Sequence, residues 1–214
     1  MRIIKMFMAI GIAMISCGIT LGQKKGGLGI QAGINRVFVT VDKTVDIKVT
    51  PMIGFHIGFF YNMQIVKDFR VSSAVIYITK GAESEFRDGP ETFHNKSYVR
   101  CIEVPIQCSY RLFKLKSFSC TSGVYISANP YLDINIYGSI RTFKDKKYED
   151  YPMNIGNSKD DNIKRFTSGI KVGLSIHLDH IEPYLGYDWG ITPLSSNLKD
   201  NSHRAFYFGL AFHL

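Results

Sequence analysis

The stretch “PMIGFHIGFFYN” (residues 51–62) alternates between large apolar residues and mostly small or polar ones. A repeat of two residues is the spacing at which a β-strand turns successive side chains to opposite faces. One face of this stretch is therefore wholly apolar, while the other carries glycine, histidine and one phenylalanine. The apolar face consists of Ile53, Phe55, Ile57, Phe59 and Tyr61. The class of protein depends on which of the two faces meets water.

The same period of two recurs along the chain, and no helical period competes with it. A length of 214 residues is typical of one domain. The segments together predict an all-β domain with eight strands. These strands are expected at residues 27–35, 51–62, 69–80, 98–112, 118–134, 169–178, 181–190 and 204–214.

The residues opposite the apolar faces discriminate between a soluble sandwich and a membrane barrel. In a sandwich the second face meets water and is rich in charged residues. Here it is mostly glycine, serine, asparagine and glutamine, which suits the narrow, filled interior of an eight-strand barrel. The apolar face would then meet lipid. The alternative is a soluble exported barrel, similar to a lipocalin, whose apolar faces point inward and bind a small apolar ligand.

Long and short connections alternate between the predicted strands. The long ones lie near residues 36–51, 81–97, 135–165 and 192–203, and the short ones near 63–68, 113–117 and 179–180. Outer-membrane barrels have short periplasmic turns and long external loops. The sequence therefore predicts an eight-stranded antiparallel up-and-down transmembrane β-barrel in the cell outer membrane.

The first 22 residues have the layout of a cleaved signal peptide. Arg2 and Lys5 precede an apolar run over residues 6–21, and the small residues Thr20 and Gly22 precede the expected cut. This prediction gives a signal peptide at 1–22 and a barrel domain at 23–214. Cys17 raises the alternative of a lipid anchor, but the apolar run continues past it, which favours an ordinary signal peptide.

The last stretch, “FYFGLAFHL” (206–214), alternates up to Leu214. It resembles the C-terminal signal by which barrel-assembly machinery recognises its clients, although Leu214 replaces the more usual aromatic residue. That machinery is therefore an expected partner during insertion.

Four motifs, in order along the chain, resemble those of the PorT-type outer-membrane β-barrel proteins of Bacteroidetes. They are “VIYITKGA” (75–82), “CIEVPIQCSYRL” (101–112), “GIKVGLSIHL” (169–178) and “YLGYDWGITPL” (184–194). The resemblance implies an eight-strand barrel. The chain departs from the family at Ala74, where Glu is frequent, and at Thr167 or Ser168, where Asp is frequent. The founding member is linked to protein secretion, a role that membership alone does not transfer.

Glu103, Lys171 and Asp188 fall on the inner faces by strand parity. A buried charge needs a partner, so we expect the three to form an interior polar network with a structural role. A gate or proton path is the functional alternative. Cys108 and Cys120 flank a predicted turn at equal distance and are candidates for a disulfide; the alternative is two small thiols that face lipid.

Other site chemistry finds little support. His56, His177 and His213 share the inner face, but their spacing does not form a metal-ligand motif, so we expect no metal and no cofactor. No G-x-S-x-G motif organises a nucleophile, so no catalytic residues are predicted. The net charge of +8 is dispersed and the chain is exported, which argues against nucleic acid.

The sequence therefore predicts an integral outer-membrane protein without catalytic activity. It would act through its extracellular loops, chiefly residues 135–165, in adhesion, partner docking or support of a secretion complex. The expected partners are outer-membrane lipid and lipopolysaccharide, contacted through basic loops, and a protein bound at the extracellular loops.

Overall fold

The computed structural model describes residues 26–39, 48–88, 91–115, 122–144, 147–156, 158, 161–194 and 202–214. The predicted signal peptide and Cys17 lie outside these residues. The strands in chain order are β1 (Gly26–Val39), β2 (Lys48–Val66), β3 (Phe69–Asp88), β4 (Glu91–Lys114), β5 (Gly123–Lys144), β6 (Lys147–Pro152), β7 (Ile155–Gly156), β8 (Ile163–Lys164), β9 (Phe166–His177), β10 (Ile181–Gly190) and β11 (His203–His213).

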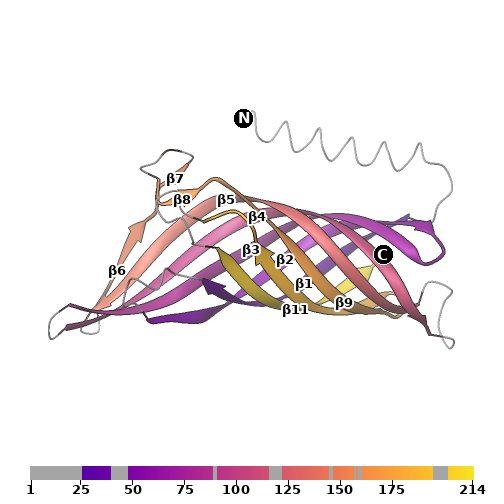
Figure 1. Cartoon of the computed structure of the whole chain (residues 1–214), viewed down its shortest axis with the longest axis horizontal. Coiled ribbons are helices and arrows are strands. Elements are labelled where there is room, and N and C mark those ends of the chain that lie inside the picture. Colours follow the sequence, from indigo (N-terminus) through magenta and orange to yellow (C-terminus); the bar gives the residue numbers. More distant parts are fainter. Residues whose placement is uncertain are drawn as a thin grey trace.

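Eight of these strands close into a barrel (Figure 1). Each of β1 to β5 pairs antiparallel with the next, β5 pairs with β9, β9 with β10, β10 with β11, and β11 returns to β1. The predicted eight-strand up-and-down barrel is confirmed. Within the described ranges, no helix is long and apolar enough to cross a membrane.

The seam between the first and last barrel strands depends on two glycines. Gly33 of β1 lies directly opposite Gly209 of β11. A Cβ atom at Gly33 would overlap the carbonyl oxygen of Phe208 and the Cα of Gly209. Glycine therefore allows the two backbones to approach closely enough to close the ring.

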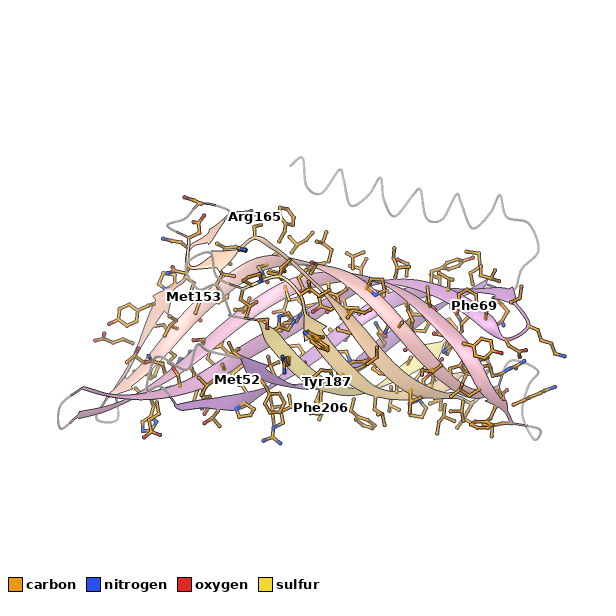
Figure 2. All side chains as sticks on the ribbon, viewed as in Figure 1. Met52, Phe69, Met153, Arg165, Tyr187 and Phe206 are labelled. Carbon is orange, nitrogen blue, oxygen red and sulfur yellow. The ribbon has the colours of Figure 1, made fainter. Side chains whose placement is uncertain are left out.

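The barrel is apolar outside and polar inside. On β2, Ile53, Phe55, Ile57 and Phe59 are all exposed, and the outward residues of the other barrel strands repeat this pattern. Figure 2 shows side chains projecting from the whole outer surface. The buried polar and charged side chains lie inside, among them Glu103, Lys171 and Asp188. The lipocalin-like alternative is therefore wrong, because it requires apolar faces that point inward.

The two ends of the barrel differ, which sets its orientation. At one end, the turns are short: residues 67–68 join β2 to β3, and residues 178–180 join β9 to β10. Asp179 has a positive φ of 51°, as a tight turn requires. At the other end, the β3–β4 and β5–β6 hairpins reach well past the ring (Figure 1). Because outer-membrane barrels keep short turns in the periplasm, the long hairpins face outward from the cell.

The outward end contains more strand than the sequence pattern predicted. β3 has 20 residues and β4 has 24, whereas a membrane crossing needs about 9–11. The expected loop at 81–97 is wrong, because it is the continuation of these two strands. The expected loop at 135–165 contains the rest of β5, then β6 and the short parallel pair β7–β8. Both faces of these segments lie beyond the lipid, so the apolar alternation that marks the other strands is absent.

We call this projection the outer sheet and define it as residues 48–51, 82–88, 91–99, 138–144 and 147–152. Its strands pair in the order β2, β3, β4, β5 and β6.

Substitution of Gly33 tests the seam. Gly33→Leu should lower the free energy of unfolding by about 2 kcal/mol or more, because the side chain collides with the β11 backbone. The measurement is the fraction of protein that keeps heat-modifiable gel mobility across a urea series. Ala32→Leu, one residue away on the lipid-facing side, is the control and should be tolerated. Equal losses in the two variants would contradict the close approach.

Candidate functional site

The barrel interior contains a first ion cluster nearer its outward end. Lys171 of β9 donates from Nζ to both carboxylate oxygens of Glu103 of β4, at 2.5 and 2.6 Å. Glu103 is fully buried and Lys171 nearly so. Asp188 of β10 lies directly opposite Lys171 in the β9–β10 register, and Lys80 of β3 approaches the carboxylates of both Glu103 and Asp188. The Nζ atom of Lys80 lies 3.7 Å from Glu103 and 3.8 Å from Asp188.

The sequence prediction missed Lys80 and two of its partners, Asp133 and His203. Its Nζ atom donates to Asp133 Oδ2 at 2.7 Å and lies 3.1 Å from His203 Nε2. The hydroxyl of Tyr131 donates to Asp188 Oδ1 at 2.7 Å, and the Lys80 and Lys171 ammonium groups lie 4.9 and 5.1 Å from the Tyr131 ring centre. Two ammonium groups thus lie among three carboxylates, and each buried charge has an opposite charge close to it.

A second ion cluster lies nearer the periplasmic end. The guanidinium of Arg70 pairs with Glu182 Oε1 and stacks 4.1 Å above the Tyr125 ring. His177 Nδ1 lies 3.1 Å from Glu182 Oε2, and His213 Nε2 lies 2.8 Å from the same oxygen. One carboxylate therefore holds a cation and two imidazoles that come from β3, β9 and β11.

His177, Glu182 and His213 are also three residues of metal-ligand type that lie close together. Sequence spacing did not reveal this group, because its members come from three neighbouring strands and meet only through the strand register. Glu182 already pairs with Arg70, so the carboxylate is satisfied without an ion. His56, the third histidine that the sequence placed on the inner face, instead contacts the Tyr184 hydroxyl at 2.6 Å.

Little free space remains between the two clusters. A cavity of about 70 Å³ lies inside the barrel, lined by residues that include His56, Gln107, Asn129 and Ser175. That volume holds a few water molecules. The described side chains thus fill most of the lumen, as expected for eight strands.

Cys108, one of the two candidate disulfide residues, does not take the expected register. Cys108 of β4 lies opposite Ala128 of β5. The prediction that residue 120 would face Cys108 is wrong, because the β4–β5 connection does not turn around Lys114; that residue instead pairs with Gly123. Cys120 itself lies outside the described residues, so the bridge stays a prediction. Cys101 faces the interior and is fully buried.

An apolar exterior, a charged interior and unequal ends define an integral outer-membrane β-barrel protein. Residues 22–196 match the model of the outer membrane protein beta-barrel domain family. The chain belongs to this family, and it is located in the outer membrane. No curated protein matches the chain.

Solved structures of three outer-membrane proteins are similar to this chain. The attachment invasion locus protein Ail of Yersinia pestis has 13% identity and a TM-score of 0.49, with 89% of this chain and 99% of Ail covered. Neisserial surface protein A has 13% identity and a TM-score of 0.47, covering 89% and 100%. OprG of Pseudomonas aeruginosa has 10% identity and a TM-score of 0.42, covering 90% and 98%.

Neutralisation of Glu103 tests the structural role of the first ion cluster. Glu103→Gln leaves the buried Lys171 ammonium without its carboxylate, so the free energy of unfolding should fall by about 3–5 kcal/mol. Urea titration of the refolded protein in detergent micelles, followed by heat-modifiable mobility, gives this value.

Glu83→Gln is the matched control, because Glu83 and Lys96 form an exposed ion pair at 2.8 Å in the outer sheet. Its loss should cost less than about 1 kcal/mol. The double variant E103Q/K171M should recover part of the stability lost in E103Q. An unchanged unfolding midpoint in E103Q would contradict a structural role for the cluster.

Proposed function

We propose that this protein is a non-catalytic outer-membrane barrel that presents its outer sheet to a partner outside the cell. The sheet would serve adhesion, partner docking or support of a secretion complex. The observation that carries the proposal is the length of β3 and β4, which exceeds a membrane crossing about twofold. A filled barrel needs no such projection to stay in the membrane.

The tip of the outer sheet offers chemistry that suits protein recognition. Tyr148 and Tyr151 of β6 are 61% and 51% exposed. Arg141 of β5 lies 4.8 Å from the Tyr148 ring and pairs with Asp150 at 2.7 Å. Hydrogen bonds from Arg141 lower the pKa of the Asp150 carboxyl, which keeps this pair charged. Tyrosine and arginine are enriched among residues that dominate binding energy at interfaces.

The interior favours a structural role over catalysis. The histidines, carboxylates and tyrosines that resemble catalytic groups contact one another inside a lumen with room for only a few waters. His203 is fully buried, and its Nε2 atom lies 2.9 Å from the Tyr131 hydroxyl. Such a lumen leaves little room for a substrate beside these groups. This supports a protein without enzymatic activity and without a solute channel.

Three further parts of the proposal rest on the sequence. The proposed membership among the PorT-type barrels of Bacteroidetes is supported by the resemblance of the motifs at 75–82, 101–112, 169–178 and 184–194. Residues 1–22 act as a cleaved signal peptide. The alternating C-terminal stretch, which lies in β11, acts as the signal that barrel-assembly machinery recognises.

Site-specific photo-crosslinking in intact cells tests the proposed surface. A photoreactive residue at Tyr148 should give a discrete adduct of higher mass, and Tyr151→Ser should weaken that adduct several-fold. The same residue at Lys114, at the opposite end of the barrel, is the control and should not give this adduct. The proposal fails if position 148 yields no adduct, or if both positions yield the same one.

A further inference from the structure

We propose that the outer surface of β10, β11 and β1 carries a binding site for the phosphate group of an outer-leaflet glycolipid such as lipid A. Arg36 and Arg204 form this site with the aromatic side chains around them. We call it the arginine pair site and define it as Arg36, Phe38, Tyr187, Trp189, Arg204 and Phe206. It depends on the membrane location alone and is independent of the proposed partner at the outer sheet.

The position of the site along the barrel axis matches the outer membrane surface. On β1 the outward residues run from Leu28 through Ile34 and then reach Arg36. On β11 they run back from the C-terminal end of the strand to Phe206 and then reach Arg204. Eight residues of a tilted strand span about 20 Å, close to the roughly 25 Å height of the apolar band of such barrels. The two arginines therefore lie where hydrocarbon gives way to headgroups.

The two arginines are neighbours on the same face. Arg36 lies opposite Phe206, and Arg204 lies opposite Phe38. This diagonal arrangement places the two residues about 7–8 Å apart, with their Cβ atoms somewhat closer. Two arginine side chains that start from such neighbouring positions can both reach one phosphate, which accepts hydrogen bonds from each guanidinium group.

Aromatic rings hold both guanidinium groups in place. The Cζ atom of Arg36 lies 5.6 Å from the centre of the Phe38 ring, and that of Arg204 lies 5.3 Å from the Trp189 ring. Phe206 packs edge-on against Phe38 at 6.0 Å and against Tyr187 at 5.1 Å. Tyr187 and Phe206 lie at the same level of the barrel in Figure 2. Rings of this kind form the interfacial girdle of outer-membrane barrels.

The charge of the pair is not balanced within the described part of the chain. Arg141 and Lys96 pair with carboxylates in the outer sheet, as Arg70, Lys80 and Lys171 do inside the barrel. Arg36 and Arg204, in contrast, make only ring contacts among the described residues. Two adjacent like charges at a lipid boundary are stabilised by an anion, and headgroup phosphates are anions that lie at this depth.

Arg100 of β4 gives an internal comparison. It also faces outward and lies 4.9 Å from the ring of Tyr137. Thr79 and Tyr137 lie directly opposite it, and its diagonal neighbours are uncharged, so no second cation lies beside it among the described residues; these diagonal neighbours include Tyr77, Gly81 and Ser139. We therefore assign the phosphate site to the pair and expect Arg100 to contribute far less.

Native mass spectrometry of the detergent-purified full chain tests the site, with diphosphoryl lipid A as the probe. The wild-type barrel should bind one lipid A at low micromolar concentration, and fully dephosphorylated lipid A should bind at least about tenfold more weakly. The double variant R36Q/R204Q should lose about tenfold in affinity. R36K/R204K keeps both positive charges but loses the planar guanidinium groups, so its affinity for lipid A should lie between those of the wild type and R36Q/R204Q.

Arg141→Gln, in the outer sheet, and Arg100→Gln are the controls, and each should change the affinity less than threefold. Inorganic phosphate at 10 mM should not displace the lipid, because the acyl chains also bind the barrel. The proposal is overturned if the dephosphorylated lipid binds equally well, if the double variant is unchanged, or if inorganic phosphate displaces lipid A. The comparison of the two lipids on the wild-type protein decides the matter even if the double variant does not fold.

Discussion

A bilayer supplies no hydrogen-bond partners to the backbone, and the rest of this structure follows from that constraint. A sheet in lipid must close on itself so that no strand edge is left unpaired. Here closure depends on the β1–β11 pairing, where Gly33 lies opposite Gly209. The closed sheet then turns one face to lipid and the other to a narrow lumen, so the apolar and polar sides of an ordinary soluble domain are exchanged.

That exchange explains why so many charged residues are buried. Polar side chains that would meet water in a soluble protein must here satisfy one another. The buried charges pair with one another in two ion clusters, one around Lys171 and Glu103 and one around Arg70 and Glu182. The interior thus holds the barrel together, whereas the functions proposed for this protein lie on its outer surface and beyond the membrane.

The sequence predicted the barrel because period two is visible wherever one strand face meets lipid. The stretch at 51–62 forms β2 with the expected faces, and strand parity correctly turned Glu103 inward. Parity gives the face of a residue but not its height in the lumen, which depends on strand register. Lys80 and Asp133 were therefore missed, although both lie on inward positions.

Two other differences have related causes. The outer sheet has water on both sides, so it lacks the apolar alternation that marks a strand, and the sequence predicted loops there. The predicted register of Cys108 was wrong. The length of the β4–β5 connection decides which β5 residue lies opposite Cys108, and the sequence pattern does not reveal that length. In both places the missing information is long-range pairing rather than local propensity.

The central claim is that the apolar face meets lipid, and the single tryptophan of the chain tests it directly. Trp189 points outward and is 54% exposed. In vesicles, lipids brominated on the upper part of the acyl chain should quench its fluorescence strongly, whereas aqueous iodide should have little effect. Strong quenching by iodide with none by brominated lipid would contradict the account.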